Sequence, residues 1–162
     1  MDEVLGKFER IRLTKPKRVI DASVILETVF ETDFCCTNYI KNAGFDYQAF
    51  ITIPLLGETI LKIISKLSKA PLIKEKVFDL VSDLIQGGRL HIIPHNTSSD
   101  EIFRNLQISL SIIPRDDLLH IAEIITSGFN EFVTIDTKIS KDSAKRVLHE
   151  QFKLKVINPK QK

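Results

Sequence analysis

The sequence predicts a three-layer α/β/α domain with a central, mostly parallel sheet of four to five strands and helices on both faces. Short apolar segments rich in β-branched residues alternate along the chain with longer segments of helical periodicity. This alternation is typical of α/β domains built on a parallel sheet. The length of 162 residues corresponds to one domain, and a composition of 43% hydrophobic and 27% charged residues is usual for a globular protein.

Charge, cysteine usage and hydropathy argue against several classes of protein. A net charge of +2 is too small to attract nucleic acid through a general positive field. Cys35 and Cys36 are adjacent and have no spaced partners, so we expect neither a disulfide framework nor a zinc knuckle, which fits a reducing compartment. The N-terminus is charged from Asp2 onwards, and no apolar run reaches the roughly 18 residues that span a bilayer. We therefore expect a cytoplasmic protein without a membrane segment.

The expected elements follow one another in a regular order. Strands are expected at 17–20, 49–53, 90–93, 131–136 and 154–157. Helices are expected at about 23–30, 34–41, 55–67, 71–85, 98–109, 114–126 and 139–151. Residues 1–16 are expected to form an arm or a short helix, and residues 17–158 the folded domain, with a helical stretch at about 55–110. Right-handed crossovers place the carboxyl ends of parallel strands at one edge of the sheet, where ligands bind in open α/β folds.

Four carboxylates are expected at this edge. Asp21 and Asp136 end the first and fourth predicted strands, and Glu58 and Asp117 lie in the first turn of helices that begin at the same edge. Each acid also has a structural interpretation. Asp21, Asp136 and either Asp116 or Asp117 could cap helices, and Glu58 could interact with a helix dipole, which contributes about 0.3–1 kcal/mol. Because four acids coincide at one edge, we interpret them together as a site.

A cluster of four carboxylates needs compensation for its negative charge. Two carboxylates 4 Å apart repel each other by about 4 kcal/mol at an effective dielectric constant near 20. Shared protons or bound cations can offset this repulsion, and Mg²⁺ and Mn²⁺ are ions that prefer oxygen ligands. Such ions activate water and stabilise the negative charge that develops during phosphodiester hydrolysis. The acids therefore indicate metal-dependent phosphodiester hydrolysis.

The order of the motifs resembles that of the PIN-domain nucleases over nearly the whole chain. The resemblance is carried by the segments VIDASVIL, LLGETI, PRDDLLHIAEI and FVTID. Asp117 with His120 and Ala122 resembles the Asp-x-x-His-x-Ala form of the family, and this register selects Asp117 over Asp116. The chain departs from compact members in its longer helical stretch between Glu58 and Asp117 and in the additional Asp116.

The resemblance implies a role for each matched residue. Asp21, Glu58, Asp117 and Asp136 would be the catalytic acids and would hold Mg²⁺ or Mn²⁺, directly or through water. The supporting residues would be Ser23, Thr134 and Asp116.

The same resemblance implies an endoribonuclease, most closely a VapC-like enzyme, which is the toxin of a toxin–antitoxin pair. RNA would be the substrate, and the partners that it suggests are a small antitoxin protein and a second copy of the chain. Two alternatives stay open at the level of the sequence. One is a housekeeping RNA-processing nuclease, and the other is a non-catalytic module of the same fold that binds RNA or protein and uses its acids only as helix caps.

Other polar residues are interpreted as structural. His120 is expected to be a structural residue of its helix, and Pro94 between His91 and His95 argues against a zinc site there. Several lysines are interpreted as a solvated helix face, with a track for RNA phosphates as the alternative: Lys62, Lys66, Lys69, Lys74 and Lys76. The apolar side of the helix at about 55–67 is expected to comprise Leu56, Ile60, Ile63, Ile64 and Leu67.

Overall fold

The computed structural model describes residues 15–68, 74–96 and 98–161. The expected N-terminal arm lies outside the described residues except for its last two positions. Pro71, the expected start of a helix, and Lys69 also lie outside the described residues, as do the side chains of Lys74 and Lys76.

Five parallel strands form one sheet in the order β3-β2-β1-β4-β5. The strands are β1 (Lys17–Ile20), β2 (Gln48–Thr52), β3 (Leu90–Ile93), β4 (Glu131–Val133) and β5 (Lys155–Ile157). β1 lies at the centre, where Val19 pairs with Phe50 of β2 on one side and with Phe132 of β4 on the other. Every strand pair among the described residues is parallel, which confirms the predicted sheet.

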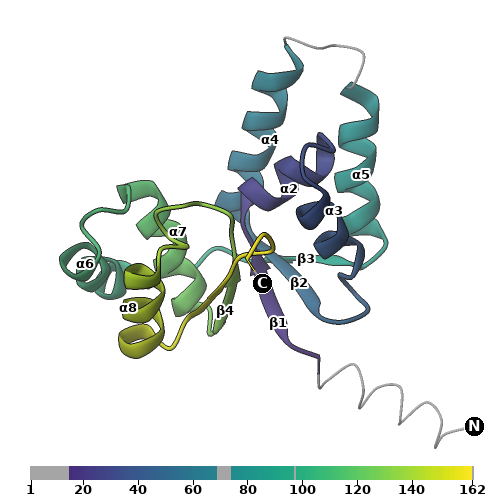
Figure 1. The fold of residues 1–162 in the computed structure, drawn as a ribbon. Coiled ribbons are helices and arrows are strands. Elements are labelled where there is room, and N and C mark those ends of the chain that lie inside the picture. Colours follow the sequence, from purple (N-terminus) through teal and green to yellow (C-terminus); the bar gives the residue numbers. More distant parts are fainter. Residues whose placement is uncertain (1–14, 69–73, 97, 162) are drawn as a thin grey trace, which may run out of the picture.

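The described residues form seven helices. They are α2 (Ala22–Val29), α3 (Phe34–Lys41), α4 (Ile53–Leu67), α5 (Lys74–Gln86), α6 (Asp100–Ser109), α7 (Arg115–Thr126) and α8 (Asp142–Phe152). Figure 1 shows α2 to α5 on one side of the sheet and α6 to α8 on the other. This arrangement confirms the predicted three layers. None of these helices has the length and apolarity that a membrane span requires.

The order of the strands reverses beside β1. The chain runs outwards from β1 to β2 and β3 through α2 to α5, and then returns to β4 and β5 through α6 to α8. The carboxyl ends of β1 and β4 therefore flank the point at which the direction of winding changes. Open α/β sheets bind their ligands in the crevice at such a switch point.

Apolar side chains of the central strands fix the position of this crevice. Val19, Ile20 and Val133 are fully buried, and Phe132 is 1% exposed. Burial of one such side chain contributes about 1.5–3 kcal/mol to the stability of the fold. Core packing therefore holds β1 and β4, and with them the residues that directly follow these strands.

Helix α4 buries only part of the predicted apolar side. Leu55, Ile63 and Leu67 are buried, whereas Ile64 is 51% exposed and Leu61 is 69% exposed. The prediction for Ile64 was wrong because aliphatic residues occur all around this helix. Periodicity alone could not choose the side that faces the core.

Two boundaries near the carboxyl edge also differ from the prediction. β4 ends at Val133 and not at Asp136, and α8 begins at Asp142 and not at Ile139. The Oδ1 atom of Asp136 accepts hydrogen bonds from the backbone N–H groups of Lys138 (2.7 Å) and Ile139 (3.1 Å). A local turn of this kind competes with helix formation, which accounts for the later start of α8.

Candidate active site

The carboxylate of Asp21 is held by hydroxyl groups and caps no helix. The backbone N–H of Asp21 donates to Val133 O (2.9 Å) and so extends the pairing of β1 with β4. Its Oδ2 atom accepts hydrogen bonds from Ser23 Oγ (2.5 Å) and Thr134 Oγ1 (2.7 Å). Asp21 precedes α2 directly, but its side chain makes no capping hydrogen bond. The interpretation of this carboxylate as a helix cap is therefore wrong.

Thr134 connects Asp21 with Asp136. Its side chain is fully buried, and its hydroxyl donates to Asp21 and accepts from the backbone N–H of Asp136 (3.0 Å). The N–H of Thr134 donates to Ile157 O of β5 (3.0 Å), and Ser140 Oγ donates to its carbonyl (3.4 Å). One buried hydroxyl thus links the positions of two of the four acids.

The carboxylate of Asp136 stabilises the loop that follows β4. Its two backbone hydrogen bonds lie within this loop, and the residue that precedes α8 is Lys141. The interpretation of Asp136 as the cap of the last helix is therefore wrong.

Glu58 lies in the second turn of α4, because the helix begins at Ile53 after the capping residue Thr52. The predicted first-turn position was wrong, so an interaction with the helix dipole does not account for this acid. Both of its carboxylate oxygens are engaged. Oε1 forms an ion pair with Lys62 Nζ, and Oε2 lies 3.0 Å from His120 Nε2.

The four acids lie within reach of one another's charges. Burial raises the pKa of Asp117, in the first turn of α7, and the charges of Asp136, Asp21 and Glu58 raise it further. Burial also raises the pKa of Asp21, against the hydrogen bonds that its carboxylate accepts, and the charge of Glu58 adds to the rise. Four elements far apart in the sequence therefore bring an excess of negative charge to one edge of the sheet. Asp116 lies beside Asp117 and is exposed.

The chemistry of these donors fits a hard divalent cation, because all four acids offer carboxylate oxygens. Within the described residues, no three His, Cys, Asp or Glu side chains are arranged so that they could hold a metal ion. Two of the acids have other partners: Lys62 and His120 each contact one oxygen of Glu58, and backbone N–H groups donate to one oxygen of Asp136. Several of these side chains would have to move closer together to bind one ion.

Neither a family model nor a curated protein sequence matches the chain, but solved structures do. VapBC2 from Rickettsia felis, bound to a DNA fragment from its promoter, is similar with a TM-score of 0.60 and 16% identity over 88% of this chain and 98% of that chain. DNA-bound VapBC from Salmonella typhimurium is similar with a TM-score of 0.55 and 14% identity over 89% of this chain and 98% of that chain. A toxin–antitoxin complex from Klebsiella pneumoniae is similar with a TM-score of 0.57 and 11% identity over 90% of this chain and 99% of that chain. The fold is PIN-like.

Two residues at the acidic edge of this PIN-like fold were missed as site residues in the sequence. Lys62 was interpreted as part of a solvated face, and His120 as structural. Burial opposes the charged form of Lys62, but the hydrogen bond to Glu58 and the charges of Glu58, Asp21 and Asp117 outweigh it and raise the pKa. The available signals were the i, i+4 spacing of Glu58 and Lys62 and the i, i+3 spacing of Asp117 and His120, which place each pair on one helix face.

A cavity of about 870 Å³ opens on the side of Glu58 and Asp117. Its lining combines charged side chains with apolar ones, among them Lys62, Asp116, His120, Leu61, Pro114 and Leu119. Glu123, also in the lining, is 4% exposed and pairs with His95 Nδ1 at 2.8 Å. The PIN-like fold thus places Glu58 and Asp117, but not Asp21 or Asp136, in the lining of a space with both polar and apolar walls.

Proposed function

We propose that the protein is a metal-dependent endoribonuclease that acts as the toxin of a toxin–antitoxin pair. Two sets of contacts carry the proposal. Thr134 joins Asp21 to Asp136, and His120, on the same helix as Asp117, contacts Glu58. The direction of the pKa shift of Asp117 agrees with them, because the charges of the other three acids raise this pKa. The PIN-like fold supports it, because chains of VapBC and other toxin–antitoxin complexes share this fold.

Asp21, Glu58, Asp117 and Asp136 would hold Mg²⁺ or Mn²⁺, in agreement with the preference of these ions for carboxylate oxygens. When bound, such an ion supplies Lewis acidity toward a phosphate oxygen and makes a water molecule more acidic. The chain therefore needs no side chain of its own as the nucleophile. Asp116, exposed on the same turn as Asp117, would add negative charge at the rim.

The hydroxyl groups around Asp21 would keep the site in order. Ser23 and Thr134 both donate to Asp21 Oδ2, so that they restrict the rotation of the carboxylate. Thr134 also fixes the backbone of Asp136. Acids held in this way need little reorganisation during the reaction, and preorganised charges of this kind supply a large part of enzymatic rate enhancement.

We expect the purified protein to cleave RNA in millimolar Mn²⁺ or Mg²⁺ and to be inactive in excess EDTA. The physical reason is that Lys62 and His120, which contact Glu58, cannot make a water molecule acidic as a divalent ion does. Electrophoresis of labelled single-stranded and structured RNAs measures the cleavage, and excess Mn²⁺ should restore it after EDTA treatment. Cleavage that persists in EDTA, or its absence in both ions, would contradict the proposal.

The toxin role is tested in cells. Expression of the chain should arrest growth, and co-expression of a small protein encoded beside it should restore growth. Normal growth during expression, together with defective RNA maturation after deletion of the gene, would instead indicate a housekeeping RNA-processing nuclease.

A second candidate is a non-catalytic binding module of the same fold. It is favoured by the engagement of both Glu58 oxygens with Lys62 and His120. Thermal unfolding in Mn²⁺ separates the two candidates. An ion present at 100 times its Kd stabilises the native protein by about 2.7 kcal/mol, which should raise Tm by about 5–10 °C for a chain of this size. An unchanged Tm would favour the binding module.

A further inference from the structure

Lys62 brings a positive charge into the acidic edge. It lies one turn after Glu58 on α4, and its Nζ forms an ion pair with Glu58 Oε1. The charges of Asp21 and Asp117 act on Lys62 as well. The side chain of Lys62 is 52% exposed, so the amine can move into solvent without disruption of the core.

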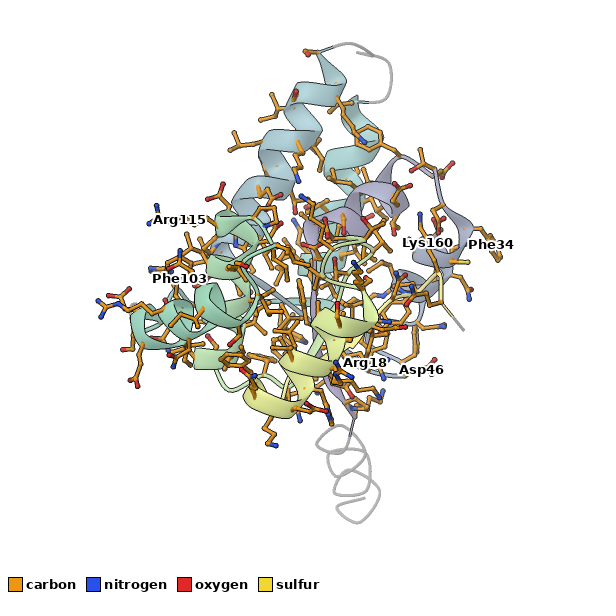
Figure 2. All side chains as sticks on the ribbon, turned by 60° about the vertical axis from the view of Figure 1, so that its left-hand side comes forward. Arg18, Phe34, Asp46, Phe103, Arg115 and Lys160 are labelled. Carbon is orange, nitrogen blue, oxygen red and sulfur yellow. The ribbon has the colours of Figure 1, made fainter. Side chains whose placement is uncertain are left out.

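Two nearby cations, Lys66 and Arg115, contact aromatic rings. Lys66 lies one turn after Lys62 on α4, and its Nζ is 4.9 Å from the centre of the Phe30 ring. The guanidinium of Arg115 lies 5.7 Å from the centre of the Phe103 ring, and Figure 2 shows this pair on one side of the molecule. Among the described side chains, Lys62 forms the ion pair with the four acids, through Glu58, and His120 Nε2 contacts the other oxygen of Glu58.

We propose that Lys62 is a built-in counter-cation that stabilises the acidic edge in the ion-free protein and competes with a divalent ion for Glu58. The inference rests on the proposed function, because it requires the acids to bind such an ion. Lys62 and His120 each contact one oxygen of Glu58, so an ion that binds this carboxylate would lie close to the positive charge of Lys62. Lys62 thus lowers the affinity of the site for the ion and keeps Glu58 fixed until the ion binds.

Lys62→Met tests this role by removal of the charge at nearly constant side-chain length. We expect Mn²⁺ to bind the variant about three- to tenfold more tightly than the wild type. The wild-type Lys62 amine repels the ion, but solvent weakens this repulsion because the side chain is half exposed. Isothermal titration calorimetry of the full chain with MnCl₂ measures the Kd. In EDTA, the variant should also have a lower Tm than the wild type, because the repulsion among the acids is then less well balanced.

Two further variants separate charge from structure. Lys62→Arg keeps the charge and should retain the wild-type Kd, and Lys66→Met makes the same change one turn away, over Phe30, and should also leave the Kd unchanged. An equal or weaker affinity of Lys62→Met would overturn the inference.

Asp21→Asn distinguishes failure of this inference from failure of the proposed function. If the wild type binds Mn²⁺ and Asp21→Asn does not, the metal site stands, and Lys62→Met alone decides the role of Lys62. If the wild type binds no Mn²⁺, or Asp21→Asn binds it equally well, the proposed function and this inference fall together.

Discussion

Asp21→Asn is expected to lower metal-dependent RNA cleavage by about 100-fold or more, the usual cost of losing one preorganised electrostatic group at an active site. Asparagine has nearly the shape of aspartate and can still accept hydrogen bonds from Ser23 and Thr134, but it lacks the negative charge that would hold the ion. Single-turnover cleavage of a labelled RNA in saturating Mn²⁺ measures the effect. A rate within a few-fold of the wild type would remove Asp21 from the site.

The same variant provides its own control for folding. Burial and the charge of Glu58 raise the pKa of Asp21, so its charged form is unfavourable in the folded protein. This cost is fully present above the raised pKa and is lost as the pH falls through it, because the native carboxyl group then binds a proton. We therefore expect Asp21→Asn to stabilise the ion-free protein at pH 7 and to do so by less at lower pH. Urea unfolding in EDTA measures the difference, and destabilisation at pH 7 would mean that lost activity reflects damage to the fold.

Thr134→Val should weaken both the fold and the site. Valine fills the same space, but it leaves the N–H of Asp136 without its partner and removes one donor to Asp21. A buried polar group without a partner costs about 1–3 kcal/mol, and loss of a residue that orients metal ligands typically costs about 10–100-fold in affinity or activity. Urea unfolding and Mn²⁺-dependent cleavage measure the two effects.

Thr134→Ser is the matched control, because it keeps the hydroxyl and loses only a methyl group. We expect it to retain most of the stability and cleavage activity that Thr134→Val loses. If Thr134→Val cleaves RNA at the wild-type rate, the link from Thr134 to Asp21 and Asp136 has no part in the reaction.

The sequence was sufficient to predict the sheet. The site that the four acids would form at the edge of this sheet stays a prediction. The short apolar segment before Asp21 is a buried strand, and its sharp end at a carboxylate placed this acid at the edge of the sheet. Asp117 could be distinguished from Asp116 by its register with His120, and the structure shows Asp117 half-buried and Asp116 exposed. The sheet depends on local periodicity and on the rules of parallel connections, which a sequence records well, whereas the choice of Asp117 came from the resemblance to the PIN-domain nucleases.

Contacts between distant helices could not be predicted in the same way. His120 approaches Glu58 only because α7 and α4 meet in the folded chain, and 62 positions separate the two residues in the sequence. The face of α4 could not be chosen from periodicity, since Leu61 and Ile64 are exposed although both are aliphatic. Lys62 was therefore assigned to a solvated face, whereas its charge lies beside the acids. Asp136 was placed within a strand because its turn depends on side-chain hydrogen bonds to the backbone.

Crystals soaked in Mn²⁺ test the central claim most directly, because anomalous scattering from manganese locates the ion without ambiguity. We expect a peak at the carboxyl edge of the sheet, bound by carboxylate oxygens of Asp21 and of at least two of Glu58, Asp117 and Asp136. The absence of a peak at this edge in millimolar Mn²⁺, or a peak bound only elsewhere on the chain, would contradict the claim that these acids form a metal site.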